Sequence, residues 1–127
     1  MQGINISVIS GNLTRDPAIR TTAQGTGIIS FSVAVNDRIK GKDGNYTDYT
    51  NYIDVTAFNA VDYLAKNLSR GSHVVVEGRL RHTTWESKDG SGKRSKLEII
   101  ATHIEVERKA QPEAASPEVD YSEEIPF

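Results

Sequence analysis

The sequence predicts an all-β fold, a small barrel of five antiparallel strands with one short helix between the third and fourth strands. Three observations support this prediction. Several segments alternate apolar and polar residues with a period of two. One segment, 60–69, instead repeats its apolar residues at intervals of three and four. Polar, Gly-rich segments separate these elements, and 127 residues suffice for one domain with one core.

The first two strands are expected over residues 4–13 and 28–37. Gly11 lies inside the first strand, where a glycine marks a bulge or a close approach of another backbone. The core side of the second strand carries Ile29, Phe31, Val33 and Val35. The segment 14–27 between the two strands is rich in turn residues and is expected to be a loop.

The third strand is expected over residues 49–58, after a hairpin loop that contains an Asp-Gly turn signal. Its predicted core residues are Ile53, Val55 and Ala57. Its predicted outward residues are Tyr52, Asp54, Thr56 and Phe58. The helix over 60–69 follows, and Gly71 just beyond it can end it.

The last two strands are expected over residues 73–86 and 96–107, joined by a second polar, Gly-rich hairpin loop. In the first of these, Val74, Val76, Leu80 and His82 point one way, and the intervening residues, from Val75 to Trp85, point the other. The resulting order, three strands, a helix and two strands, is that of an OB-fold, a five-stranded partly open barrel.

The charges divide the chain into two parts. Residues 1–109 contain all 15 Lys and Arg against 12 Asp and Glu, a net charge of +3. Residues 110–127 contain five acids and no Lys or Arg, which brings the chain to −2. This second part is rich in Pro, Ala and Ser and is expected to be disordered. We therefore expect a domain over 1–109 and an acidic interaction tail over 110–127.

Composition also bears on compartment and chemistry. The chain has no cysteine, which excludes disulfides and thiolate metal sites. No secretory signal and no apolar stretch of about 20 residues is visible, so a cytoplasmic protein without membrane contact is expected.

The three histidines, His73, His82 and His103, show no metal-ligand spacing, and no phosphate loop or nucleophile elbow is visible. We expect no enzyme activity, no metal and no cofactor.

Aromatic and basic side chains share the predicted outward faces. Trp85 lies on the same face as Arg79 and Arg81, and Tyr52 and Phe58 share the outward face of the third strand. Rings on which bases stack, next to cations that follow phosphates, are what a single-stranded nucleic acid requires. The alternative is that these rings cover a subunit interface or the underside of the barrel.

The two hairpins are basic as well. Their cations are Arg38, Lys40 and Lys42 in the first hairpin and Lys88, Lys93, Arg94 and Lys96 in the second. Charged hairpins are usually just solvated loops, but in an OB-fold loops flank the binding face. Recognition of duplex DNA is not expected, because no helix has a basic face that could enter a groove.

The sequence resembles the bacterial and phage single-stranded-DNA-binding protein family over nearly its whole length. Five stretches carry the resemblance in register, "GNLTRDPAIR" (11–20), "FSVAVN" (31–36), "YIDVTAFN" (52–59), "LSRGSHVVVEGRL" (68–80) and "TTW" (83–85). The final "EEIPF" is similar to the acidic tip of that family.

The resemblance implies an OB-fold subunit, usually in a homotetramer, that binds single-stranded DNA with little sequence preference. It implies that Tyr52, Phe58 and Trp85 stack bases, and that Arg20, Arg79 and Arg81 meet the phosphate backbone. It further implies that the tip binds replication, recombination and repair proteins. The tip residues are Glu123, Glu124, Ile125, Pro126 and Phe127.

Two residues depart from the family pattern. Ile39 stands near a position where members often carry an aromatic residue, and Asp54 places an acid on the DNA side. Both imply weaker or more salt-sensitive binding. Two alternatives to a DNA-binding protein are an OB-fold adaptor whose main ligand is protein, and an RNA-binding OB module. A bacterial chromosomal, secondary or phage origin all remain open.

Overall fold

The computed structural model describes residues 2–108, so the predicted tail over 110–127 and its tip lie outside the described residues. The described elements are, in chain order, β1 (Ser7–Leu13), β2 (Ala18–Thr21), β3 (Gly27–Lys40), β4 (Tyr46–Ala57), α1 (Val61–Asn67), β5 (His73–Glu86) and β6 (Lys93–Arg108). In this part of the chain no helix is long and apolar enough to cross a membrane. The strand, helix and strand order agrees with the predicted one, apart from the additional strand β2.

Five strands close into a barrel, which confirms the predicted OB-fold. The neighbours run β1-β5-β6-β4-β3, and a short antiparallel contact of Asn12 with Ala34 joins β3 back to β1. The pairing of β4 with β6 is parallel, through Val55 opposite Ile99. The other neighbours in the barrel pair antiparallel.

The expected loop over 14–27 was partly wrong, because it contains β2. This strand pairs antiparallel with the first residues of β3, with Arg20 opposite Ile28. Every residue of β2 is exposed, so apolar alternation could not reveal it. Its place is determined by backbone pairing with an otherwise free edge of β3.

The barrel interior is filled from every strand of the closed sheet and from α1. Alternation in β3 is confirmed, since Ile29, Phe31 and Val33 are fully or almost fully buried. The rest of the buried cluster is Leu13, Val55, Ala57, Leu64, Leu68, Val74, Val76, Ile99 and Ala101. Burying a Val, Leu, Ile or Phe side chain stabilises by about 1.5–3 kcal/mol, so this cluster supplies most of the driving force for folding.

Two glycines mark the places where strands come closest. A Cβ on Gly11 would lie 2.2 Å from the carbonyl oxygen of Ala34, and one on Gly78 would lie 2.2 Å from that of Ile100. Both distances are far inside van der Waals contact, so neither position can hold a side chain without moving backbone. The close approach expected at Gly11 is therefore confirmed.

A bulge in β6 changes which side of the strand is buried. Glu77 lies opposite His103 and Gly78 lies opposite Ala101, so Thr102 is the extra residue. Before the bulge, odd-numbered residues such as Ile99 and Ala101 face the core. After it, the even-numbered Ile104 and Val106 pack against the core.

The helix α1 is shorter than expected and ends differently. It stops at Asn67, and Leu68 is already extended while its N–H donates to the carbonyl oxygen of Leu64. Gly71 has a φ of 91° and donates its N–H to the carbonyl oxygen of Leu13. Gly71 therefore shapes the turn into β5 and does not cap the helix.

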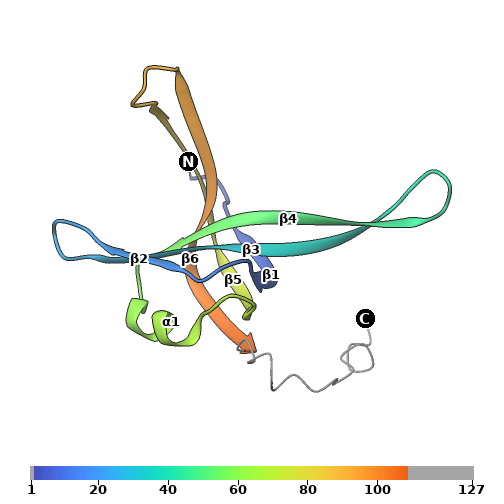
Figure 1. Ribbon diagram of the computed structural model, residues 1–127, viewed down its shortest axis with the longest axis horizontal. Helices are drawn as coiled ribbons and strands as arrows, with labels where there is room; N and C mark the ends of the chain where they lie inside the picture. Colours follow the sequence, from blue (N-terminus) through green and yellow to red (C-terminus); the bar gives the residue numbers. More distant parts are fainter. Residues whose placement is uncertain (1, 109–127) are drawn as a thin grey trace.

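Two hairpins extend from the barrel in different directions. Figure 1 shows β3 and β4 continuing to the right and β5 and β6 continuing to the top. The residues of the first arm, 36–49, and those of the second arm, 79–86 and 93–97, are exposed. The N-terminal segment runs beside the second arm, where the Asn5 side chain exchanges two hydrogen bonds of 2.8 and 2.9 Å with the backbone of Leu80.

Candidate nucleic-acid interface

A groove of about 580 Å³ lies where the second arm meets the barrel. It is lined by Arg20, Ile28, Ser30, Thr56, Phe58, Arg81, Thr83, Trp85, Lys96 and Glu98. Five of the predicted binding residues meet here, namely Arg20, Phe58, Arg81, Trp85 and Lys96. They come from β2, β5, β6 and the residue after β4, so the groove exists only in the folded barrel.

The register of β5 and β6 explains why these side chains share one side of the arm. Residues directly opposite each other on paired strands project from the same face. Arg81 lies opposite Glu98, Thr83 opposite Lys96, and Trp85 opposite Arg94. Arg94 thus joins the ring of Trp85 on the groove side of the arm.

Glu98 lies inside the groove and is 5% exposed. Its Oε1 accepts a hydrogen bond of 2.6 Å from the hydroxyl of Thr56 and lies 3.7 Å from Lys96 Nζ. Its Oε2 accepts a hydrogen bond of 3.0 Å from Arg81 Nη2. Burial alone would raise the pKa of Glu98, but the Thr56 and Arg81 hydrogen bonds and the charges of Lys96 and Arg81 outweigh it and lower that pKa. Glu98 is therefore a carboxylate that holds both cations in place.

The cluster around Glu98 was not foreseen from the sequence. Thr56 was expected to face outward into solvent, but it is 6% exposed because Glu98 covers it. Alternation in "KLEI" does place Lys96 and Glu98 on the side away from Leu97 and Ile99. It could not show that a carboxylate on that side is buried.

Two further hollows continue the groove. One, of about 340 Å³, shares Ser30 and Lys96 with it and adds Arg15 and Asp54. The other, of about 490 Å³, shares Phe58 with it and continues along Ile19 to the start of α1. Lys96 and Phe58 are thus the junctions of one track across the barrel.

Arg15 is a cation on this track that sequence reasoning missed. The signal available was a positive charge in a turn-rich segment. Asp54 lies on the track as expected, and it adds a negative charge next to Lys96 and Arg15.

The remaining predicted residues lie outside the groove. Tyr52 is 69% exposed on the outward side of β4, two residues before Asp54 along the strand. Arg38 and Lys40 lie farther out on the first arm. Arg79 is exposed on the same side of β5 as Arg81, and it lies opposite Ile100. Lys93 lies opposite Glu86 and projects from the other side of the arm from Arg94.

The tip residues form the last predicted set. Glu123, Glu124, Ile125, Pro126 and Phe127 lie outside the described residues.

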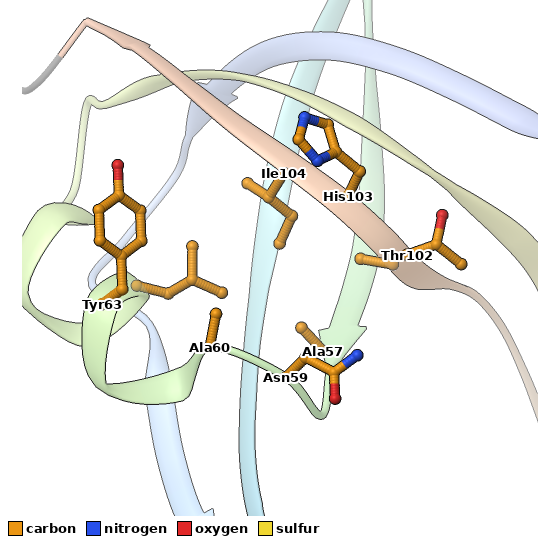
Figure 2. Close-up of a pocket in the computed structure, with 9 residues that line it drawn as sticks. Ala57, Asn59, Ala60, Tyr63, Thr102, His103 and Ile104 are labelled. Atoms are coloured by element: carbon orange, nitrogen blue, oxygen red, sulfur yellow. The ribbon is translucent and has the colours of Figure 1, made fainter.

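A separate hollow lies at the other end of the barrel, between the start of α1 and the β6 bulge. Figure 2 shows Tyr63 and Ala60 on one side of it and Thr102, His103 and Ile104 on the other. Its volume is about 260 Å³, and none of the predicted binding residues lines it. Within residues 2–108 no group of three or more His, Asp or Glu side chains is placed to hold a metal ion. The chemistry of the described surface is therefore concentrated in the track of rings and cations.

Comparison with known proteins places this geometry among related chains. The model of the single-strand binding protein family matches residues 4–107. A single-stranded DNA-binding protein from Borreliella burgdorferi is 36% identical over 84% of this chain and 71% of its own. Single-stranded DNA-binding protein 2 from Chlorobaculum tepidum is 33% identical over 98% of this chain and 84% of its own.

A single-stranded DNA-binding protein from Deinococcus radiodurans is 36% identical over 80% of this chain, which spans 34% of that relative's length. Among solved structures, a Plasmodium falciparum SSB complex with ssDNA superposes with a TM-score of 0.77 at 22% identity, covering 83% of this chain and 96% of that one. The Thermus aquaticus single-stranded DNA-binding protein, in a deletion mutant, superposes with a TM-score of 0.73 at 25% identity, covering 88% and 53%.

Proposed function

This chain belongs to the single-strand binding protein family, and from that premise we propose that it binds single-stranded DNA with little sequence preference. One observation carries the proposal. The barrel gathers two aromatic rings, Phe58 and Trp85, and two cations, Arg20 and Lys96, into one exposed groove. Such a groove offers π-faces to any base and positive charge to the backbone that links the bases.

The binding mechanism divides between rings and charges. Bases stack on Trp85 and Phe58, each stacked base stabilising the complex by about 1–3 kcal/mol. Arg20, Arg15 and Lys96 neutralise phosphates and release counterions, so the affinity falls as salt is added. Arg81 contributes less charge than its position suggests, since Glu98 already pairs with it at 3.0 Å.

Residues outside the groove extend the proposed contact surface. Tyr52 provides a further ring on the path from the groove to the first arm, on which Arg38 and Lys40 provide cations. Arg94 lies beside Trp85 on the groove side of the second arm. Arg79 and Lys93 add positive charge at its edges.

The broader role that we propose is to coat and protect single-stranded DNA during replication, recombination and repair. The tip residues Glu123 to Phe127 recruit partner proteins, with Phe127 in an apolar pocket of the partner and basic side chains around the carboxylates. We propose a homotetramer in a bacterial cytosol or nucleoid, or a phage-encoded equivalent. Exposed apolar side chains along the N-terminal segment and the second arm support self-association, namely Ile4, Ile6, Val8, Leu80 and Leu97.

The test is a fluorescence titration with oligo-dT at low and high salt, beside a duplex of equal length and an oligo-U of equal length. Trp85 is the only tryptophan, so its emission reports on one place in the groove. We expect strong quenching by oligo-dT, little by duplex, and weaker binding as salt increases.

Three outcomes would change the proposal. Binding without quenching would leave the function standing and remove Trp85 from the path. Tighter binding of oligo-U than of oligo-dT would favour an RNA-binding module. No binding at low salt, together with strong self-association, would favour a protein-interaction adaptor.

A further inference from the structure

We propose that Tyr46, with Arg38 against its ring, forms a second stacking platform for single-stranded DNA at the outer end of the first arm. The strand then leaves the barrel groove past Tyr52 and continues along β3 and β4. This inference rests on the proposed function and extends it to a residue that sequence reasoning did not single out.

The side of the arm on which Tyr46 lies follows from the register. The pairing of β3 with β4 runs without interruption from Ile29 opposite Ala57 to Lys40 opposite Tyr46. Alternation therefore holds along the whole ribbon, and Tyr46 and Tyr52 share a side with Asp54. Since Asp54 lines the track beside Lys96, this side of the arm continues the binding track. Six residues of strand separate the two tyrosines, about 20 Å at about 3.4 Å per residue.

The surroundings of the Tyr46 ring are those of a base-stacking site. The guanidinium carbon of Arg38 lies 5.8 Å from the ring centroid, within range of a cation–π contact. Arg38 Nε also lies 3.6 Å from Asp48 Oδ1, which holds the guanidinium over the ring. The side chain of Tyr46 is still 60% exposed, so much of the ring surface is open to a base. Lys40, directly across the ribbon, is placed to meet the adjoining phosphate.

Tyr49 shows that exposure of an aromatic ring alone does not make such a site. It is on the opposite side of the same ribbon and is 56% exposed, almost as much as Tyr46. Its partner across the ribbon is Asp37, an acid, whose carboxylate accepts a hydrogen bond from Asn51. A phosphate would be repelled from that side. The two tyrosines are thus matched in size, arm and exposure and differ in the charge beside them.

The experiment compares Tyr46→Ala, Tyr46→Phe and Tyr49→Ala with the unaltered chain. Each binds a short oligo-dT of about 6 nucleotides, which fills the groove, and a long one of about 16 or more nucleotides, which also reaches the arm. We expect Tyr46→Ala to weaken binding of the long oligonucleotide about fivefold to a hundredfold. The short oligonucleotide should bind and quench Trp85 as before. Tyr46→Phe and Tyr49→Ala should behave like the unaltered chain with both.

Each contrary result has a distinct meaning. If the unaltered chain binds neither oligonucleotide, both the proposed function and this inference fail. If it binds both and Tyr46→Ala binds the long one equally well, the inference fails while the function stands. Equal losses for Tyr46→Ala and Tyr49→Ala, or an equal loss with the short oligonucleotide, would assign the effect to a general change in the protein and overturn the inference.

Discussion

The two halves of β5 belong to the same strand but are subject to different constraints. In the barrel half, Val74 and Val76 are completely buried. In the arm half, every residue from Arg79 to Glu86 is exposed. β3 divides in the same way, with a buried half around Val33 and an exposed half beyond Val35. Packing determines the residues of the barrel half, whereas the arm half is free to carry rings and charges for a ligand.

The arms must then be held together by other means, because a two-stranded ribbon is marginally stable in water. In the first arm, polar side chains bridge the strands. The hydroxyl of Thr50 donates to Asn36 at 2.8 Å, and the amide of Asn51 donates to Asp37 at 2.8 Å. These bridges bury little apolar surface, so we expect substitutions in the arms to change affinity and substitutions in the barrel to change stability.

The largest effect that would test this comparison is a change of stability in the barrel. Gly78→Ala places a Cβ 2.2 Å from the carbonyl oxygen of Ile100, so β5 and β6 must move apart. Inserting a methyl group into packed structure typically costs about 1–3 kcal/mol, and a backbone clash belongs at the upper end. We expect a loss of about 3 kcal/mol in the free energy of unfolding, measured by urea denaturation.

Gly3→Ala is the control for this change. A Cβ there meets nothing within 4 Å, so its stability should remain within about 0.5 kcal/mol of the unaltered chain. Equal stability of the two variants would mean that Gly78 does not set the spacing of the barrel.

The second effect is a loss of affinity with little change in stability. Trp85 is 45% exposed in the second arm, so Trp85→Ala removes a stacking surface and little buried area. We expect oligo-dT binding to weaken by about 1–3 kcal/mol, measured by anisotropy of a labelled oligonucleotide, with urea denaturation almost unchanged. Trp85→Phe should recover part of the loss. A variant that binds normally but unfolds easily would place Trp85 in the structural class instead.

The third effect lies at the boundary between barrel and arm, where Glu98 serves both. Glu98→Gln removes a charge that accepts hydrogen bonds from Thr56 and Arg81, and we expect a loss of about 1 kcal/mol in stability. It also frees the charge of Arg81, so the dependence of log affinity on log salt should steepen by about 0.7 for one more phosphate contact. An unchanged slope would show that Glu98 does not limit the charge available to DNA.

The same residue predicts a dependence of stability on pH. The pKa of Glu98 is lowered in the folded protein from an ordinary value of 4.5. Its contribution to stability is therefore complete above pH 4.5 and is lost as the pH falls through the lower pKa of the folded state. Urea denaturation in this acid range should show the difference between the unaltered chain and Glu98→Gln shrinking. A difference that stays constant would contradict this assignment.

The smallest effect concerns the acid on the track. Asp54→Asn removes a negative charge next to Lys96 and Arg15. We expect oligo-dT to bind about twofold tighter at low salt, because the charge is partly exposed and its repulsion is modest. The gain should fade at high salt, where such charges are screened. Weaker binding of Asp54→Asn would mean that the carboxylate positions the cations rather than opposing phosphate.

About half of the candidate site could be predicted from the sequence. Period-two alternation placed Phe58, Arg81 and Trp85 on outward faces, and the structure brings these three into one groove with Arg20 and Lys96. Alternation could not separate Lys93 from Arg94 with respect to the groove, because both lay in an expected loop rather than in a strand. It also missed Arg15 and Glu98, since neither belongs to an aromatic or basic pattern.

The fold shows the same division. The sequence alone determined the five barrel strands, the single helix and the core faces of β3 and β4, because alternation is a local property that records which side of a strand avoids water. The tertiary structure alone decided the parallel contact of Val55 with Ile99, the pairing of β2, and the bulge at Thr102. It also decided the burial of Glu98, whose bond to Thr56 joins residues 42 positions apart. Such features depend on which distant segments meet when the barrel closes, and no local pattern carries that information.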